Sequence, residues 1–416
     1  MFSTQLKKLI PLLCFAFSLS ALPAIGEEAS SLTIRGFGTL GAARSSSEDV
    51  EFVRDLSQPN GIKNGQWSGR IDTVLGIQAN WQINSEWEVV GQVVSRYQYD
   101  DSHSPALDWA FLKWVPDDRL SLRAGRIGSD LMMLADSRLV GYSYLTARPS
   151  VDFFGPLFFP SFDGVDGSLT LPFGNGLLRS KVFAGVVQEK ATGAPGIWDT
   201  SGSPHYGFIT DYFSGQWQFR ASASNIRFSN DLTITALTDP LHFAAELTGI
   251  TTASIAADAL SAKNTDTRYY TLGAVYDNGP LQIQAAANSI THQTATFQNS
   301  VAAYLLASYR MNTTTPYVGI SRWQTSYKNY ITGLPDTAQF APINQQFQAT
   351  LNGSSADQTT YTLGVRWDVW SSIALKLQWD SVYADGNSRF PYASSFIDPN
   401  WDGRTNVISA TMDFIF

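Results

Sequence analysis

Hydrophobic and polar residues alternate with a period of two along most of the chain. The clearest run is Arg70 to Ile83, and the last is Ile408 to Phe416. Such alternation places apolar side chains on one face of a strand and polar ones on the other. The runs are about as long as the ~9–11 residues that a tilted membrane-spanning strand requires. The pattern therefore predicts many amphipathic strands.

The connections between these runs alternate between tight turns and long loops. Seven turns lie at residues 84–85, 116–118, 174–176, 214–215, 278–280, 312–313 and 370–371. Eight long loops lie near residues 43–66, 100–105, 127–165, 191–203, 230–266, 293–298, 328–356 and 385–403. The alternation predicts an all-β transmembrane antiparallel barrel of sixteen strands, with both chain ends on the short-turn side. A soluble β-sandwich also alternates, but it rarely keeps this asymmetry of turns.

Composition agrees with a sheet that has one apolar face. Aromatic residues make up 13% of the chain and charged residues 15%, against roughly 25% charged residues in soluble globular proteins. Beyond the N-terminal region, no segment approaches the ~18 consecutive apolar residues of a spanning helix. Aromatic residues near the strand ends, such as Trp81, Trp217 and Trp379, are typical of interface girdles.

The first residues have the features of an export signal. Lys7 and Lys8 precede an apolar run that ends in the small-residue site at residues 24–26. We expect a signal peptide at residues 1–26 and a single barrel domain at residues 27–416. The one cysteine, Cys14, lies in the leader, so no disulfide is expected. The remaining 26 Lys and Arg face 36 Asp and Glu, a net charge of −10 that disfavours nucleic-acid binding.

The loop at residues 127–165 is too long and too apolar for an ordinary hairpin connection, and loops of this length commonly carry function. It begins next to Gly125-Arg126, contains Val140-Gly141-Tyr142 and Arg148-Pro149, and ends in the segment Asp163 to Gly167. With the alternating last strand and the terminal Phe416, these residues resemble the trimeric porins of the Gram-negative outer membrane. The Pro-Glu-Phe-Gly-Gly signature of general porins is absent.

The resemblance implies several properties of the molecule. The loop after the fifth strand would fold into the barrel and narrow it. The protein would lie among outer-membrane lipid and lipopolysaccharide as a homotrimer. Phe416 would be the C-terminal signal that the barrel-assembly machinery reads. The long extracellular loop at residues 230–266 is Ala-rich from Pro240 to Lys263, and we expect it to be in part helical.

Charged residues on the polar faces of lipid-exposed strands must point into the lumen. The expected wall is net basic, which indicates tolerance of anionic or carboxylate solutes. Arg126 is an even number of residues away from neighbours that face outward. It therefore needs a bulge at Gly125 or a place at the rim to face inward. The expected basic wall consists of Arg35, Arg70, Arg96, Arg123, Arg126, Arg366 and Lys376. The expected constriction-loop residues are Asp130, Asp136, Tyr142, Tyr144, Arg148, Asp152, Phe153 and Phe154.

Two interpretations of the aromatic part of this loop stay open. The phenylalanines either pack the loop against the wall or, with Tyr142, Tyr144 and Arg148, form a surface for sugars or aromatic acids. The favoured function is a passive diffusion channel for small hydrophilic solutes. The alternatives are a substrate-selective channel of the same fold and a plugged barrel that acts as an enzyme or adhesin. No cofactor or metal is expected, since the four histidines lie in separate segments and the glycines at 36–41 precede no helix.

Overall fold

The chain forms one closed antiparallel barrel of sixteen strands. The computed structural model describes residues 30–416 except 194–195, 233, 386–387, 389–391 and 398–400, so the leader expected at residues 1–26 lies outside the described residues. Closure comes from β1 (Ser31–Ser45), which pairs with both β21 (Arg404–Ile415) and β4 (Val74–Gln82). A two-residue strand, β3 (Trp67–Ser68), extends the sheet beside the end of β1. The remaining barrel strands are β5 (Trp87–Arg96), β6 (Ala106–Trp114), β7 (Leu120–Gly128), β8 (Ser161–Phe173), β9 (Gly176–Val187), β12 (Ser203–Ser214), β13 (Trp217–Arg227), β14 (Asp266–Asp277), β15 (Leu281–His292), β16 (Asn299–Tyr309), β17 (Thr314–Ser326), β18 (Asp357–Trp370) and β19 (Ile373–Ala384).

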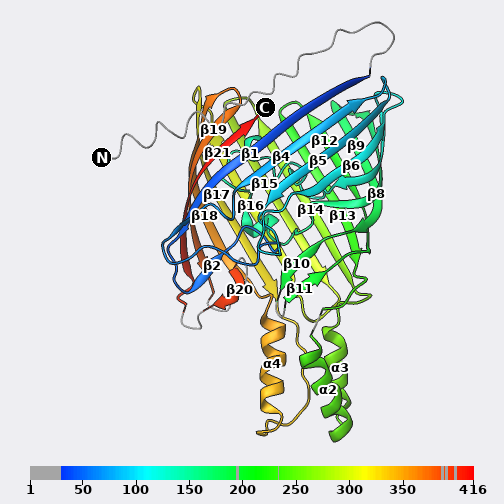
Figure 1. Ribbon diagram of the computed structural model, residues 1–416, viewed down its shortest axis with the longest axis vertical. Coiled ribbons are helices and arrows are strands. Elements are labelled where there is room, and N and C mark those ends of the chain that lie inside the picture. The colour runs from blue at the N-terminus through cyan, green and yellow to red at the C-terminus, as the bar shows by residue number, and fades with distance from the viewer. Residues whose placement is uncertain (1–29, 194–195, 233, 386–387, 389–391, 398–400) are drawn as a thin grey trace.

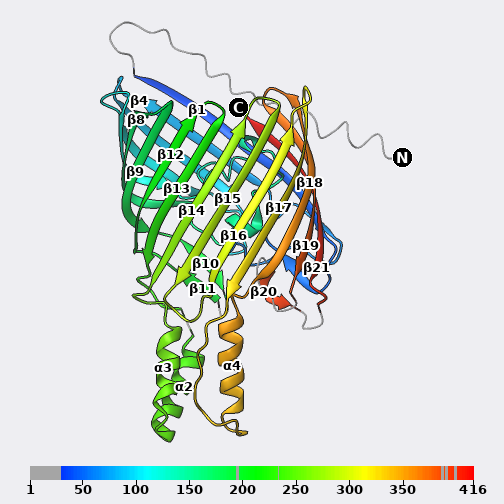
Figure 2. The same cartoon turned by 180° about the vertical axis from the view of Figure 1, so that it is seen from behind.

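The short turns and the long loops lie at opposite ends of the barrel, which we call the short-turn end and the long-loop end (Figure 1). This confirms the strand count and the alternation of connections expected from the sequence. The fifth long loop contains α2 (Thr235–Thr248) and α3 (Thr251–Leu260), and the seventh contains α4 (Ala341–Asn352). These helices project beyond the barrel (Figures 1 and 2). Loop segments also form two small sheets, β2 (Val50–Phe52) with β20 (Tyr392–Ile397) and β10 (Lys190–Gly193) with β11 (Gly196–Asp199).

The outer face of the barrel is apolar and exposed, as a lipid-facing wall requires. Leu32, Ile77 and Leu272 are 63%, 50% and 65% exposed, respectively. Polar residues on the inner face, such as Gln92 and Ser222, are buried. A soluble protein has the reverse arrangement, so closure and the apolar exterior rule against the soluble sandwich. Among the described residues, no helix is both long and apolar enough to span a bilayer.

The two ends of the sheet meet at the short-turn end. The Gly36 N–H donates to the Phe416 carbonyl at 2.8 Å, and the Phe416 N–H donates back to the Gly36 carbonyl at 2.9 Å. The Phe416 ring lies over Gly36 so closely that a Cβ there would be 2.1 Å from a ring carbon. The last residue therefore continues the β1–β21 ladder.

The loop between β7 and β8 is shorter than its sequence pattern indicated. Ile127 pairs with Phe162 and Gly128 with Ser161, so the strands extend into the range 127–165. The connection itself is residues 129–160, which we call the inner loop because its contacts lie on the inner face of the wall. It contains a 3-10 turn, η3 (Gly141–Ser143), and one helical turn, α1 (Val151–Phe154).

Candidate functional site

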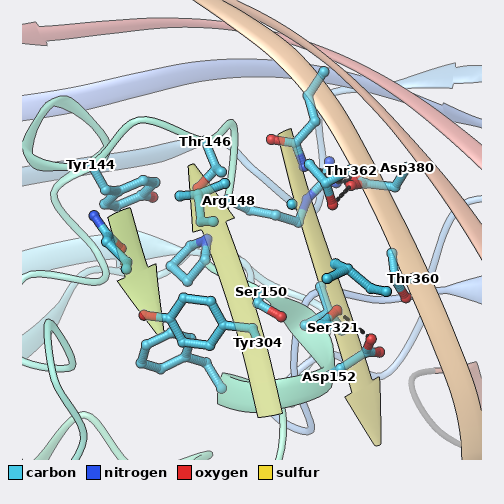
Figure 3. Close-up of a pocket in the computed structure, with 18 of the residues that line it drawn as sticks. Tyr144, Thr146, Arg148, Ser150, Asp152, Tyr304, Ser321, Thr360, Thr362 and Asp380 are labelled. Carbon is cyan, nitrogen blue, oxygen red and sulfur yellow. Dashed lines mark hydrogen bonds and ion pairs between the residues drawn. The ribbon is translucent and has the colours of Figure 1, made fainter. Parts of the chain in front are cut away.

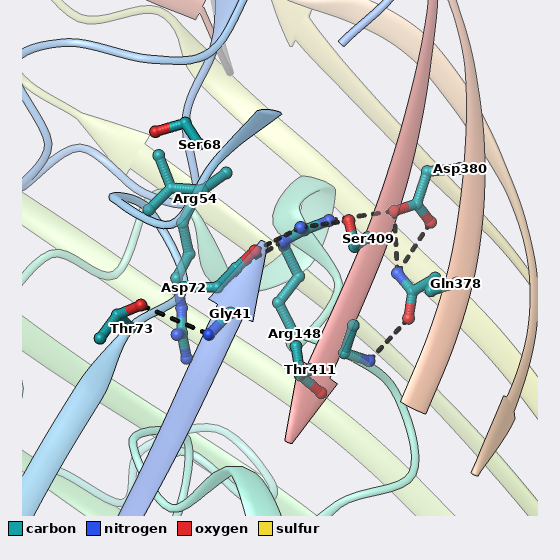
Figure 4. A network of polar contacts seen from close by, with 12 residues as sticks. Gly41, Arg54, Ser68, Asp72, Thr73, Arg148, Gln378, Asp380, Ser409 and Thr411 are labelled. Carbon is teal, nitrogen blue, oxygen red and sulfur yellow. Dashed lines mark hydrogen bonds and ion pairs between the residues drawn. The ribbon is translucent and has the colours of Figure 1, made fainter. Parts of the chain in front are cut away.

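A buried ion-pair network anchors the inner loop beside the barrel seam (Figure 4). Arg148 Nε and Nη2 lie 3.0 and 2.6 Å from the two oxygens of Asp72, which precedes β4. Its Nη1 lies 3.1 Å from Asp380 of β19, and Nη2 also donates to Ser409 of β21 at 2.6 Å. Burial alone would lower the pKa of Arg148, but the two carboxylates outweigh burial and raise it. Arg148 therefore stays charged and ties the loop to separate strands.

Two cations of the expected basic wall also hold the inner loop. Lys376 Nζ donates to the carbonyls of Gly141 and Thr146 at 2.7 and 2.9 Å, and it pairs with Asp413 at 3.1 Å. Gly141 is required here, since a Cβ would lie 2.0 Å from the Asp413 carboxylate. Lys376 thus lies on the inner face, with its three donor contacts made inside the protein.

Arg366 acts in the same way on the next part of the loop. Its Nη1 donates to the carbonyls of Tyr142 and Tyr144 at 2.7 and 3.0 Å, and Nε binds Asp368 at 2.8 Å. The guanidinium lies 4.7 Å from the Tyr142 ring centroid, and the Lys376 ammonium 4.5 Å from that of Tyr144. The tyrosine segment is therefore held by hydrogen bonds and by cation–π contacts.

The start of the inner loop is bound half-way round the closed sheet, by β9 and β13. Lys181 forms an ion pair with Asp130. Arg220 donates to the carbonyls of Asp130 and Met132 at 2.8 and 3.2 Å. Burial would raise the pKa of Asp130, but Lys181 and the nearby arginines lower it below its ordinary value. The inner loop is thus bound to strands on opposite walls of the barrel.

Further ion pairs lie on this side of the barrel. Arg123 on β7 pairs with Asp166, and Arg220 pairs with Asp211 at 2.7 Å. Asp136 of the inner loop is exposed, and its charge acts on both Arg123 and Arg220. In this cluster, cations are paired with carboxylates. Its net positive charge is therefore smaller than the net charge of a wall of unpaired basic residues.

The aromatic part of the inner loop is packed away from solvent. Phe153 is fully buried and Phe154 is 7% exposed, and both rings contact Tyr304 of β16, at centroid distances of 5.0 and 6.2 Å. Asp152 is buried and accepts a hydrogen bond from Ser321 (Figure 3). It accepts another from Gln358. Phe153 and Phe154 therefore follow the packing interpretation. A solute surface formed by Phe153, Phe154 and Arg148 is wrong, since Arg148 is only 1% exposed.

Four expected wall residues lie elsewhere than at a constriction. Arg35 shares the inner face of β1 but is exposed near the short-turn end. Arg96 ends β5 and donates to Ser57 in the first long loop at 2.8 Å. Arg70 is wrong as an inward strand residue, because it precedes β4 at the rim and lies 3.7 Å from Asp101.

Arg126 is also wrong as a lumen residue. The ladder from Ala124 to Arg126 runs without a register shift on both sides, so no bulge turns the side chain inward. Arg126 keeps the face of the exposed Leu122 and makes two hydrogen bonds with Asp163, at 2.7 and 2.9 Å. It pairs with an acid on the outer face, near the long-loop end.

The sequence pattern missed two arginines that stiffen the inner loop. Arg54 of the first long loop donates to the Arg138 carbonyl at 2.7 Å, and Arg138 donates to the Leu157 carbonyl. Burial lowers the pKa of Arg138 to about 10. Both residues lie outside any alternating run, so the period-two pattern could not indicate the direction of their side chains. Among the described residues, no group of three or more His, Cys, Asp or Glu is arranged to hold a metal ion.

The inner loop separates two large cavities. One of about 540 Å³ opens toward the short-turn end and is lined by Tyr142, Tyr144, Arg310 and Arg366, among others. The other, of about 430 Å³, lies toward the long-loop end above Phe158. The two share no lining residue. A smaller cavity of about 70 Å³ beside Arg148 and Tyr144 lies against the loop (Figure 3).

Solved structures with the same fold are outer-membrane proteins. The Salmonella typhi OmpF complex with daunomycin matches with a TM-score of 0.56 and 12% identity, over 94% of this chain and 99% of that one. The anion-selective porin from Comamonas acidovorans gives 0.54 and 13%, over 93% and 100%. The trimer form of Vibrio cholerae OmpT gives 0.51 and 11%, over 93% and 100%. No protein-family model and no curated protein sequence matches the chain. At these identities the likeness shows the fold, which is that of the sixteen-stranded porins.

Proposed function

We propose that the protein is a passive channel in the outer membrane of a Gram-negative bacterium, through which small hydrophilic solutes diffuse past the inner loop. One observation carries the proposal: the inner loop crosses a barrel with a polar inner face and is bound on opposite walls, by Arg148 with Asp72 and by Lys181 with Asp130. A loop fixed across a water-accessible lumen sets the size of what passes. The apolar exterior supports the membrane location.

The charges beside the inner loop favour a modest preference for anions. Arg123, Lys181, Arg220, Arg366 and Lys376 all have carboxylate partners, which reduces the net field. Arg35 and Arg310 have no ion pair among the residues that the structure describes, and both lie toward the short-turn end. Because paired charges still form local dipoles, the lumen would orient polar solutes more than it selects their sign.

A second candidate is a substrate-selective channel of the same fold. The separate linings of the two large cavities favour it, because a solute must pass a narrow segment between them. Such a channel shows saturable transport and a conductance that its substrate blocks, whereas simple diffusion does neither.

The assembly partners belong to the same proposal. A homotrimer is supported by the trimeric form of the structural neighbour from Vibrio cholerae. Arg227, Arg268 and Arg404 are exposed on the outer face at the long-loop end, where lipopolysaccharide phosphates would lie. The contact of Phe416 with Gly36 supports a role for the terminal residue when the barrel-assembly machinery closes the sheet.

Liposome swelling tests the channel directly. Proteoliposomes placed in arabinose, glucose or stachyose should swell at rates that fall as the sugar becomes larger, since diffusion past a fixed constriction is limited by size. Liposomes with Arg148→Met protein should swell faster in the larger sugars. Swelling no faster than that of protein-free liposomes would refute the channel.

A further inference from the structure

The cavity of about 430 Å³ at the long-loop end has the features of a binding site of its own, and we call it the aromatic vestibule. Its floor is formed by Pro156 and Phe158 of the inner loop. Its sides are the long-loop ends of β14 to β17, and its roof includes residues of α2 and α4. Pockets of this size that are mainly apolar, with few polar groups, are typical of small-molecule sites.

Aromatic rings from separate loops and strands converge on this space. Trp198 lies on β11, in the fourth long loop, and its ring centroid is 4.3 Å from that of Phe228 and 5.2 Å from that of Phe297. Aromatic rings pack favourably on one another in edge-to-face and tilted arrangements, so this lining suits a ring-shaped ligand. The aromatic lining residues are Phe158, Trp198, Phe228, Tyr269, Phe297 and Trp323.

The lining carries little charge. Among the described residues that line it, Asp55 is the one acid, and no Lys or Arg is present. Burial would raise the pKa of Asp55, but Arg96 and Arg138 outweigh burial and lower it. A carboxylate ligand would therefore lose its hydration and find no cation in the lining, so uncharged molecules are favoured.

The indole N–H of Trp198 is buried beside the cavity and does not open into it. Trp198 is 7% exposed, and its indole Nε1–H has no hydrogen-bond acceptor in the part of the chain that the structure describes. A ligand in the cavity would therefore meet the ring of Trp198 and not its N–H group. The polar side chains of Gln58 and Gln298 are already bound to backbone carbonyls, at 2.9 Å each.

From this geometry we propose that the aromatic vestibule binds small uncharged aromatic or alicyclic molecules, which pack against the rings of its lining. The inference deepens the proposed channel function, because it assigns a solute class to the entrance above the inner loop. It does not depend on charge selection at Arg123 and Arg220.

Calorimetric titration of the full-length protein in detergent micelles tests the site, with empty micelles subtracted. Acetophenone, an uncharged aromatic ketone, should bind saturably, and benzoate at least about tenfold more weakly. Trp198→Ala removes one ring of the lining, so the affinity for acetophenone should fall about fivefold. Ala349→Trp on α4 fills the cavity from an exposed position and should abolish binding. Gln345→Trp, exposed on the same helix but outside the lining, should bind as the wild type does.

The outcomes separate this inference from the channel itself. Absence of saturable acetophenone binding, equal affinity for benzoate, or unchanged binding in Ala349→Trp would each overturn the site. Sugar-dependent swelling of liposomes without acetophenone binding would remove the vestibule and leave the channel standing. Binding that Ala349→Trp abolishes, in a protein that conducts no sugar, would establish the site and refute the channel.

Discussion

Arg148 and Asp72 form a two-point ion pair inside the barrel, with atom separations of 3.0 and 2.6 Å and with both side chains 1% exposed. Asp72 lies two residues before β4, and Arg148 lies in the second half of the inner loop. The pair therefore determines where the loop crosses the lumen. A buried pair adds modest net stability, but removal of one partner leaves an uncompensated charge and is strongly destabilising.

Arg148→Met should release the inner loop from the seam. Asp72 and Asp380 would then lie buried without their shared cation, so the free energy of unfolding should fall by about 3 kcal/mol. Thermal unfolding of the protein in micelles, followed by near-UV circular dichroism, measures this change. The matched control is Arg322→Met, whose exposed pair with Asp357 should change stability by less than about 1 kcal/mol. Equal unfolding temperatures for Arg148→Met and the wild type would contradict the anchor.

Asp136→Asn should shift ion selectivity toward anions. The charge of this exposed carboxylate acts on Arg123 and Arg220, and its removal leaves the local field more positive. Reversal potentials in a KCl gradient across a planar bilayer measure the change. Asp239→Asn, an exposed position on α2 outside the barrel, should leave the reversal potential unaltered. A shift toward cations in Asp136→Asn would show that the account of the lumen charges is wrong.

Stability should depend on pH through Glu189, between β9 and β10. Burial raises the pKa of this carboxyl from 4.5 to about 7, with Arg96 opposing the shift and Asp108 adding to it. The folded protein then holds a proton that the unfolded chain has already released, so stability falls as pH rises from about 4.5 to 7. Glu189→Gln should flatten the curve of unfolding temperature against pH in that window. Glu246→Gln, exposed on α2, should not flatten it, and the same slope in Glu189→Gln as in the wild type would exclude this carboxyl as the source.

Gly36→Val should impair closure of the barrel. A side chain at Gly36 would collide with the Phe416 ring and disturb the reciprocal hydrogen bonds between the two residues. Removal of Phe416 would delete both of those bonds. Both changes should lower the amount of heat-modifiable folded barrel in outer-membrane fractions. The control is Gly215→Ala, in a short turn with open space around it. It tests whether the barrel tolerates a glycine substitution elsewhere, and the positive φ of Gly215 adds some strain. Normal levels of folded Gly36→Val would refute the seam contact.

Much of the fold follows from patterns that act locally. Alternation identified the strands because each lipid-facing side chain must be apolar, and turn residues identified the short connections. The run from Arg70 shows where alternation fails. It correctly places Asp72 and Gln78 on the inner face, but the strand starts only at Val74. The first residues bend away because the first long loop packs there, which alternation does not record.

The contacts of the inner loop could not be predicted from a single sequence. Arg148 joins Ser409, 261 residues away, and Lys376 joins Gly141, 235 residues away. Parity indicated that Lys376 and Arg366 face inward, but it could not show that their donors bind loop carbonyls. Arg126 was misplaced for the opposite reason: its parity indicated the outer face, and its partner Asp163 comes from the neighbouring strand.

Single-channel conductance with and without the inner loop tests the central claim most directly. Gly128 and Ser161 are paired at the end of the β7–β8 ladder, so an Asn-Gly turn can replace residues 129–160. We expect the wild type to conduct and the shortened protein to conduct at least about twice as much, because the constriction has gone. Equal conductance, or no conductance by the wild type, would contradict the account of the inner loop as the element that sets the width of the channel.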